Sequence, residues 1–258
     1  MTDLRYEAPS SLDDAVALLA DAGDSAKILA GGTDVLVQMH LDLIEPDLIV
    51  DIKNIAELRS IKKVDGGYRF GAAVSGVELM DHADFCQTWP GVMDGVSLIG
   101  SIQIKGRASV GGNVCNASPA ADSVPAMIAA DATATIVGPK GKREIPVEEI
   151  ATGPGKTSLE DGEIVVSFFL PNATAGSGGA YQRFTPRTEM DIAVVGVGIS
   201  LTLGDAGVCS AAKVSLGAVA EKVLVVEEAA QTLIGTKVDE AALGNLAAAA
   251  SAACRPID

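Results

Sequence analysis

Apolar residues in the first third of the chain recur at helical spacing and then form short continuous runs. Ser11 has the side chain of a helix N-cap, apolar residues follow at helical spacing, and Gly23 supplies a stop. This pattern predicts a helix over residues 12–20. Later apolar runs predict buried strands at 27–30 and 48–52, and a further helix is expected to carry Val35, Leu36 and Met39.

The middle of the chain begins with a hairpin signal. Apolar runs at 61–64 and 68–72 flank Asp65-Gly66-Gly67, which favours a tight turn. The stretch 106–121 is rich in Gly, Asn, Ser and Ala; it is too polar for core, and its pattern looks too ordered for a linker. The remaining expectations are helices at 75–79, 92–99 and 123–130, extended chain at 133–137, a turn at 139–142, and a strand at 164–170 ended by Pro171.

The pattern changes after residue 171. The small polar residues 172–179 predict a linker. Two long apolar runs, 192–203 and 208–219, then predict strands joined by a turn at 204–207, and helices are expected at 225–233 and 240–253. Strands followed by helices predict a two-layer α+β module, and no internal repeat is visible.

Composition and charge narrow the class of partner. Hydrophobic residues make up 48% of the 258 residues, but aromatic residues only 3%, so Ala, Val, Ile and Leu must build the core. The net charge is 19 − 34 = −15, and so acidic a chain repels the phosphate backbone of a nucleic acid. A bound dinucleotide is not excluded, because backbone N–H groups hold phosphates without a basic surface.

Cysteine and histidine are too few and too scattered for a metal centre on this chain. The four cysteines form no C-x-x-C pair and only two histidines are present, which argues against an iron–sulfur cluster or a zinc site. No pair of acids suggests a general acid and base, so no catalytic residue is assigned. Residues 1–6 lack the apolar region of a signal peptide and 247–254 is too short to span a bilayer, so we expect a cytoplasmic protein without a membrane span.

The first candidate for phosphate binding is Leu29-Ala30-Gly31-Gly32-Thr33-Asp34. A strand is expected to end here, two glycines remove side-chain bulk, and a helix is expected to begin at Thr33. Consecutive backbone N–H groups at such a turn point toward a phosphate. A plain turn is the alternative, and this motif alone does not decide between them.

The second candidate is Ala108-Ser109-Val110-Gly111-Gly112-Asn113, which continues through Asn116 to Asp122. It offers a second double glycine, hydroxyl and amide donors, and a carboxylate suited to accept hydrogen bonds from a ribose. The alternative is a capped loop before the helix at Ser123, with Asp122 as a residue of the helix start. Two such loops in one chain are harder to dismiss than one.

Two further glycine motifs carry no such prediction. Gly153-Pro154-Gly155-Lys156-Thr157 ends like a phosphate-binding P-loop, but Ile150 stands where the first glycine is required and Pro154 lacks an N–H. Gly196-Val197-Gly198 lacks the third glycine of a dinucleotide-binding fingerprint, so close packing within a strand is the better interpretation.

The two double-glycine loops resemble the paired pyrophosphate-binding loops of a known family. The runs AGGTD at 30–34 and SVGGNVCNASPAAD at 109–122 are similar to the FAD-binding medium subunit of the xanthine dehydrogenase and carbon monoxide dehydrogenase (molybdenum hydroxylase) family. The runs IGSIQIKGRASVGGN, DGEIVVSFFLP at 161–171 and AYQRFTPRTEMDIAVV at 180–195 extend the resemblance over almost the whole chain.

The resemblance implies roles for particular residues. Residues 30–35 and 109–113 would hold the FAD pyrophosphate, Asn116 and Asp122 would contact ribityl or ribose, and Val165 would lie against the cofactor through its backbone. Arg183 would lie near the flavin, where relatives often carry Lys. The implied cofactor-binding residues are Leu29, Ala30, Gly31, Gly32, Thr33, Asp34, Val35, Ala108, Ser109, Gly111, Gly112, Asn113, Asn116, Asp122, Val165 and Arg183.

Three departures from the family pattern are visible. Ser109 replaces the more usual Thr and keeps the hydroxyl, whereas Arg183 keeps the charge of Lys but not its geometry. The chain ends at 256–258, where many relatives continue. A cation near the flavin, Arg183 or Lys105, would favour the reduced, anionic flavin; equally, both side chains would serve as solvated surface charges.

The implied fold is α+β. An FAD-binding domain of two α/β subdomains (PCMH-type) would span residues 1–171, divided at about residue 55, and a C-terminal antiparallel sheet with helices would span 180–258. The implied function is electron transfer from the 2Fe-2S clusters of a small partner subunit through FAD to an external acceptor. The large partner would carry molybdopterin and oxidise the substrate, and the complex would be a dimer of heterotrimers.

Two alternatives remain open from the residues. One is a self-contained FAD-dependent oxidoreductase of the same fold, which requires an acid or base beside the flavin. The other is a nucleotide-binding module without redox activity, which reversible reduction of a bound flavin would eliminate. The substrate and the electron acceptor are not encoded in any motif of this chain.

Overall fold

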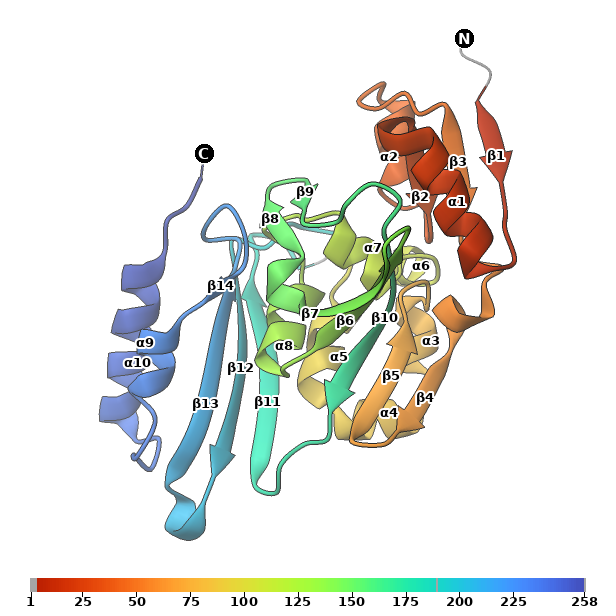
Figure 1. Ribbon diagram of the computed structural model, residues 1–258. Coiled ribbons are helices and arrows are strands. Elements are labelled where there is room, and N and C mark those ends of the chain that lie inside the picture. The colour runs from red at the N-terminus through yellow and green to blue at the C-terminus, as the bar shows by residue number, and fades with distance from the viewer. Residues whose placement is uncertain (1–3, 189, 258) are drawn as a thin grey trace.

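The structure, a computed structural model, describes residues 4–188 and 190–257. The chain forms a small N-terminal lobe, a larger second lobe and a C-terminal sheet covered by helices (Figure 1). This arrangement confirms the predicted α+β architecture. Within the described residues, no helix is both long and apolar enough to cross a membrane.

The first lobe is a three-stranded parallel sheet with two helices. Its elements in chain order are β1 (Arg5–Glu7), α1 (Leu12–Ala22), β2 (Ala26–Leu29), α2 (Val35–His40) and β3 (Leu48–Asp51), and the strand order is β1-β3-β2. Ser11 caps α1 by accepting a hydrogen bond from the Asp14 N–H, and Gly23 ends the helix with a φ of 54°, both as predicted. The carboxyl end of β2 carries the first double glycine.

The second lobe is a five-stranded antiparallel sheet. Its order is β4 (Ile61–Val64), β5 (Gly67–Gly71), β10 (Ile164–Pro171), β6 (Thr133–Gly138) and β7 (Gly141–Pro146). Phe70, Phe85 and Phe168 lie at the centre of its core. The connections between β5 and β6 are helical: α3 (Gly76–Met80), α4 (Ala83–Thr88), α5 (Pro90–Ser97), α6 (Ile102–Lys105), α7 (Val110–Cys115) and α8 (Ser123–Ala129). The short strands β8 (Ala151–Gly153) and β9 (Lys156–Thr157) form a separate hairpin.

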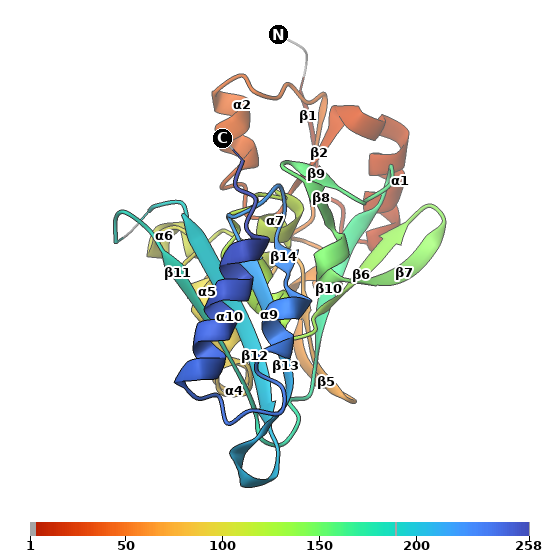
Figure 2. The same cartoon turned by 90° about the vertical axis from the view of Figure 1, so that its left-hand side faces the viewer.

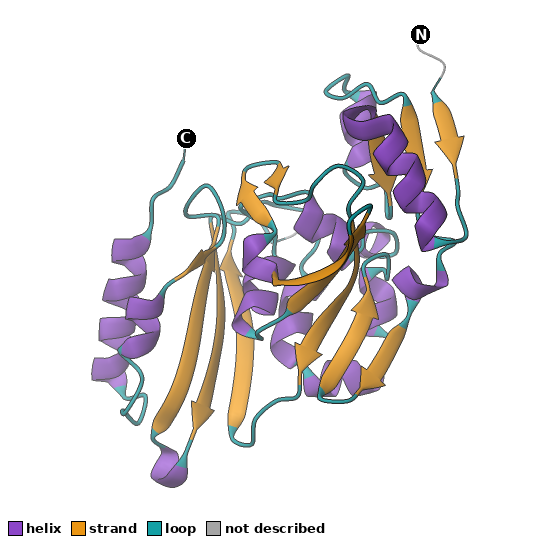
Figure 3. Ribbon diagram, in the orientation of Figure 1, coloured by secondary structure: helices purple, strands orange, loops and turns teal. Residues whose placement is uncertain are grey.

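The C-terminal region is an antiparallel sheet with helices on its outer face. The sheet order is β11 (Ser177–Phe184), β12 (Val195–Leu203), β13 (Cys209–Gly217) and β14 (Leu224–Val225). Helices α9 (Glu227–Gln231) and α10 (Glu240–Ala253) cover the face turned to the viewer in Figure 2. The opposite face packs on α5 and α8, so these two helices form a layer between the two larger sheets (Figure 3).

Close backbone packing joins this sheet to α8. A Cβ atom on Gly198 would overlap the Pro125 carbonyl oxygen, which explains why β12 carries glycine at this point and confirms the packing interpretation of the motif 196–198. The Ser215 hydroxyl, fully buried, donates a hydrogen bond to the same carbonyl oxygen at 2.6 Å. The buried backbone oxygen is therefore paired, and the sheet is held in register on the second lobe.

Several local predictions differ from the structure. The stretch 106–121 contains α7, because Ser109 caps a helix whose Val110 and Val114 are buried four residues apart. Strand β11 begins inside the predicted linker 172–179, because Ser177 pairs with Thr202 of β12. Residues 141–146 form β7 opposite β6, although only a turn at 139–142 was expected there. Strand β12 begins at Val195 rather than at 192.

Candidate cofactor site

A cavity of about 890 Å³ is lined by both lobes and by the segment after β11. The first lobe contributes residues around β2 and the start of α2, and the second contributes α7, the chain before α8, and the start of β10. Both double-glycine loops line it, although about 80 residues separate them in the sequence. The fold therefore brings together the two motifs that the sequence singled out.

The first loop turns sharply after β2. Gly32 has a φ of 79°, a conformation that favours glycine. A Cβ atom on Gly31 would overlap the Arg107 carbonyl oxygen, so this position requires close backbone approach. Helix α2 begins at Val35, two residues later than the expected Thr33. Within the described residues, the N–H groups of Gly32, Thr33 and Asp34 donate to no other backbone carbonyl, which leaves them available to a ligand.

The second loop is a helix start rather than an open turn. The Ser109 Oγ caps α7 by accepting a hydrogen bond from the Gly112 N–H at 3.0 Å. The Gly111 N–H donates to the Ala72 carbonyl oxygen at 3.1 Å, and a Cβ atom on Gly111 would overlap that oxygen. Asn113 follows, and its side-chain oxygen accepts a hydrogen bond from the Ser123 hydroxyl at 2.7 Å. The loop thus offers hydroxyl and amide side chains with little bulk.

Polar contacts link the two loops. The Asn116 Nδ2 lies 3.4 Å from an Asp34 carboxylate oxygen, and the Gln38 Nε2 lies 3.5 Å from the Asn116 Oδ1. The Arg107 Nε lies 3.5 Å from the Gly31 carbonyl oxygen. The two loops are therefore in direct contact and line the same cavity.

The cavity lining includes both apolar and polar residues. Apolar side chains come from Ile99 and Ile104 of the second lobe and from Met190 and Ile192 after β11. Polar residues include Lys27 of β2 and residues 160–163 before β10. An elongated ligand with an apolar ring system and a polar nucleotide matches such a cavity.

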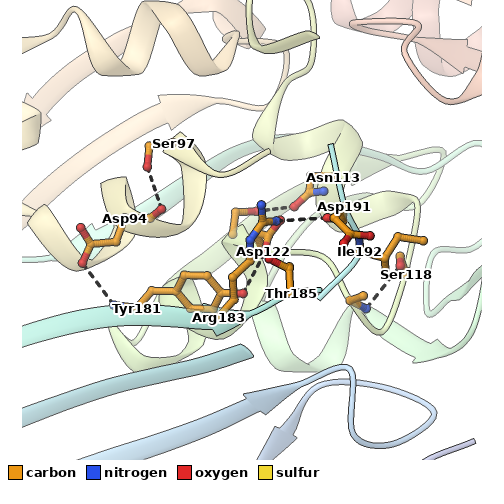
Figure 4. A network of polar contacts seen from close by, with 12 residues as sticks. Asp94, Ser97, Asn113, Ser118, Asp122, Tyr181, Arg183, Thr185, Asp191 and Ile192 are labelled. Atoms are coloured by element: carbon orange, nitrogen blue, oxygen red, sulfur yellow. Dashed lines mark hydrogen bonds and ion pairs between the residues drawn. The ribbon is translucent and has the colours of Figure 1, made fainter. Parts of the chain in front are cut away.

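Asp122 lies in the cavity wall and is held from the C-terminal sheet (Figure 4). The Tyr181 hydroxyl donates to one carboxylate oxygen at 2.9 Å, and the Arg183 Nη1 donates to the other at 2.6 Å. Burial raises the pKa of Asp122 above its usual value, while the Tyr181 hydrogen bond and the Arg183 charge act in the opposite direction. Burial, followed by the neighbouring Asp122 charge, also raises the pKa of Tyr181.

Most residues expected from the sequence meet at this cavity. Leu29 and Arg183 are the exceptions: neither lines it, and the Arg183 side chain is only 8% exposed and turned to Asp122. The lining residues that were expected are Ala30, Gly31, Gly32, Thr33, Asp34, Val35, Ala108, Ser109, Gly111, Gly112, Asn113, Asn116, Asp122 and Val165.

Other residues of the site were missed. Tyr181 carries no motif of its own, but it stands two residues before Arg183, and the alternation of a strand puts both on one face. Of the cavity-lining segment 190–192, the sequence suggested no role for residues 190 and 191, and Ile192 was expected to begin a strand. Lys27 and residues 160–163 belong to no recognisable pattern and are placed by the packing of the lobes.

Comparison with known proteins agrees with the geometry. A family model described as the FAD binding domain in molybdopterin dehydrogenase matches residues 2–173, and one described as the CO dehydrogenase flavoprotein C-terminal domain matches 180–258. The xanthine dehydrogenase FAD-binding subunit of Escherichia coli O157:H7 is 38% identical over 229 residues, covering 88% of this chain and 78% of the relative. The carbon monoxide dehydrogenase medium chain of Hydrogenophaga pseudoflava is 31% identical over 253 residues, covering 98% and 88%.

Solved structures share the whole architecture. Reconstituted CO dehydrogenase from Oligotropha carboxidovorans matches with a TM-score of 0.95 and 30% identity, covering 99% of this chain and 88% of the other. Quinoline 2-oxidoreductase from Pseudomonas putida 86 matches with a TM-score of 0.91 and 27% identity over the same shares. With the family model covering well over half the chain, the protein belongs to the FAD-binding flavoprotein subunits of the molybdopterin dehydrogenases.

Proposed function

We propose that this chain binds FAD in the cavity between its lobes and passes electrons from the 2Fe-2S clusters of a small partner subunit to an external acceptor. Substrate oxidation then takes place at the molybdopterin of a large partner subunit, in a cytoplasmic complex that is a dimer of heterotrimers. The observation that supports this most strongly is the meeting of two distant double-glycine loops at one cavity of about 890 Å³. The names of the relatives, which include xanthine and carbon monoxide dehydrogenases, point the same way.

The residues present fit an FAD pyrophosphate. At Gly31 and Gly111 the backbone lies so close to a neighbouring carbonyl oxygen that a Cβ atom would overlap it, and the shape of the cleft depends on these two contacts. The N–H groups of Gly32, Thr33 and Asp34, which have no backbone acceptor among the described residues, would donate to the phosphates. The Ser109 hydroxyl and the Asn113 side chain would face them from the second loop, with Leu29, Ala30, Val35, Ala108 and Gly112 shaping the walls.

Other residues would orient the two ends of the cofactor. Asn116 and Asp122 would accept hydrogen bonds from ribityl or ribose hydroxyls, since each Asp122 oxygen accepts a single hydrogen bond from the protein and retains a lone pair. Val165 would contact the cofactor through its backbone, and Arg183 would lie close to the flavin end. Bound FAD supplies the redox chemistry, since a flavin accepts electrons singly and releases them as a pair.

The first test is the cofactor content of the purified chain. We expect absorption bands at about 370 and about 450 nm and the release of FAD on acid treatment. A folded, colourless protein that takes up no added FAD would overturn the proposal and favour a module without redox activity. As a matched pair, Gly111→Ala is expected to lose the bands, whereas Gly153→Ala, whose Cβ would meet no atom within 4 Å, is expected to keep them.

A second measurement separates the subunit from a self-contained flavoenzyme. With its bound FAD oxidised and an external electron acceptor present, the isolated chain is expected to turn over no N-heterocycle, purine or aldehyde substrate. When expressed with its partners, it is expected to co-purify with one subunit that contains 2Fe-2S clusters and one that contains molybdopterin. Substrate turnover by the isolated chain would contradict the electron-transfer role.

A further inference from the structure

We propose that Tyr181 and Arg183 are positioning residues for the cofactor site: both hold the Asp122 carboxylate at the cavity wall. The C-terminal sheet would then complete a site that the two lobes otherwise form. The inference rests on the proposed function, because it requires Asp122 to contact FAD.

The contacts on Asp122 are made by a single strand. Tyr181 and Arg183 lie two residues apart on β11 and project from the same face toward the carboxylate (Figure 4). Each donates to a different oxygen, at 2.9 Å and 2.6 Å. Asp122 is 8% exposed and Tyr181 3% exposed. In a buried site both donors therefore fix the orientation of the carboxylate rather than merely screening its charge.

The strand itself is anchored on the second lobe. The Tyr181 N–H donates to the Asp94 carboxylate of α5 at 3.2 Å. Nearby, a Cβ atom on Gly91 of α5 would lie 2.6 Å from the Gly179 carbonyl carbon, so the helix and strand backbones are in close contact. The position of β11 is thereby fixed against α5, and Tyr181 and Arg183 are held in place by contacts that lie outside the cavity.

Arg183 also contacts the segment after β11 that lines the cavity. Its Nη1 lies 3.5 Å from the Asp191 carbonyl oxygen, and Asp191 lines the cavity with Met190 and Ile192. The charge of Arg183 is paired with that of Asp122. The side chains of this ion pair are 8% exposed for Arg183 and 10% exposed for Asp122. Arg183 would therefore act on the flavin through Asp122 and Asp191 rather than as a free cation.

The electrostatic balance gives the proposal a pH signature. Among residues 4–188 and 190–257, hydrogen bonds connect Asp122 to Tyr181 and Arg183 of β11, and these two residues in turn contact Asp94 of α5 and the backbone of Asp191. Burial raises the pKa of Asp122, and loss of the Tyr181 donor would raise it further. The ionised Asp122 carboxylate would accept hydrogen bonds from the FAD hydroxyls. The FAD affinity of such a variant should therefore fall as the pH decreases through the raised pKa of Asp122.

The test is a double-mutant cycle on FAD affinity. The full chain, freed of flavin, is titrated with FAD as wild type, Tyr181→Phe, Asp122→Asn and the double variant, with quenching of flavin fluorescence as the signal. Tyr181→Phe is expected to weaken binding about tenfold, the size of one hydrogen bond to a charged group. The double variant should bind no more weakly than Asp122→Asn, because Tyr181 acts through Asp122.

Two further arms sharpen the cycle. As the pH is lowered from neutral into the range where carboxyl groups titrate, Tyr181→Phe should begin to lose affinity at a higher pH than wild type, because its Asp122 pKa is raised further, whereas Asp122→Asn should change no more than wild type. Lys213→Met is the matched control: the Lys213 Nζ lies 2.8 Å from the Asp131 carboxylate and also joins the C-terminal sheet to the second lobe, but neither residue lines the FAD cavity. This control should keep the wild-type affinity.

The outcomes separate the two claims. A wild-type chain that binds no FAD would overturn the proposed function, and this inference with it. Wild-type binding with unchanged affinity in Asp122→Asn would overturn only the inference, as would an equal loss from Tyr181→Phe with and without Asp122. If Tyr181→Phe shows no cooperative thermal unfolding, Arg183→Gln takes its place in the cycle with the same expectations.

Discussion

The two double-glycine loops look alike in sequence but are built differently. In the first, the chain leaves a parallel strand and turns through Gly32 with a φ of 79° before α2 begins. In the second, Gly111 and Gly112 lie inside α7, behind the cap of Ser109. One loop is therefore an open turn and the other is the first turn of a helix.

The glycines of the two loops are required for different physical reasons. Gly31 and Gly111 share a role, because each lies against a backbone carbonyl oxygen that a Cβ atom would overlap. Gly32 is required by its positive φ. At Gly112, by contrast, a Cβ atom would meet only the Ser109 Oγ, at 3.2 Å, and would face the cavity. The same residue type therefore meets three different needs in the two loops: close packing, a particular backbone conformation, and space for a ligand.

The loops also differ in what they offer a phosphate. In the second loop the N–H groups of Gly111 and Gly112 already donate to Ala72 and Ser109. In the first loop, the N–H groups from Gly32 to Asp34 have no backbone acceptor among residues 4–188 and 190–257. We infer that the first loop supplies most of the backbone donors, and that the second supplies side-chain donors and a surface close enough to use them.

The largest expected effect comes from the shared role. Gly31→Ala and Gly111→Ala should each weaken FAD binding about a hundredfold, because the backbone must move away from a carbonyl oxygen. Each should also lower the free energy of unfolding by about 3 kcal/mol, as overpacking does. FAD titration and urea unfolding measure both quantities. Gly153→Ala, with open space around its Cβ, is the control that should change neither.

If only one of the two substitutions weakens binding, the loops do not form a common site. If both variants unfold more easily but keep their FAD affinity, the close approaches support the lobes and not the cofactor. Either result would contradict the shared role assigned to Gly31 and Gly111.

Sequence reasoning recovered the strands and helices that carry their own local signals. The capped helix α1, the β4–β5 hairpin and the two long strands of the C-terminal sheet follow from periodicity and turn residues. It failed at α7, because four of its six residues are Gly, Asn or Cys, and burial of Val110 and Val114 outweighs the low helix propensity of glycine. It also failed at β11, where pairing with β12 orders residues that read as a linker.

At the candidate site, too, residues with a local sequence motif were predictable and residues placed by tertiary packing were not. The residues of the two loops were predictable because their glycines and small polar side chains form motifs. Tyr181 and segment 190–192 were not, since tertiary packing alone brings them to Asp122 and to the cavity. Arg183 was expected near the flavin, but no local pattern indicated that its charge would be paired with Asp122.

A smaller effect should separate the second glycines of the two loops. Gly32→Ala places alanine at a positive φ and should cost about 1–2 kcal/mol of stability. Gly112→Ala lies within a helix, where alanine is the better helix former, so stability should hold or rise. Its Cβ would nevertheless face the cavity and should weaken FAD binding about tenfold. Equal losses of stability in both variants would contradict the assigned difference.

The smallest expected effect concerns the hydroxyl side chains close to the starts of the two helices, measured without FAD. Ser109→Ala should lower the free energy of unfolding by about 1 kcal/mol, because the Gly112 N–H in the first turn of α7 loses its acceptor. Ser109→Thr keeps an oxygen at that position and should recover most of the loss. Thr33→Ala should change stability by no more than about 0.5 kcal/mol, since the Thr33 hydroxyl makes only a 3.5 Å contact with the exposed Asp34 carboxylate. A loss at Thr33 as large as that at Ser109 would mean that the first loop is capped as the second is, and its open N–H groups would no longer distinguish it.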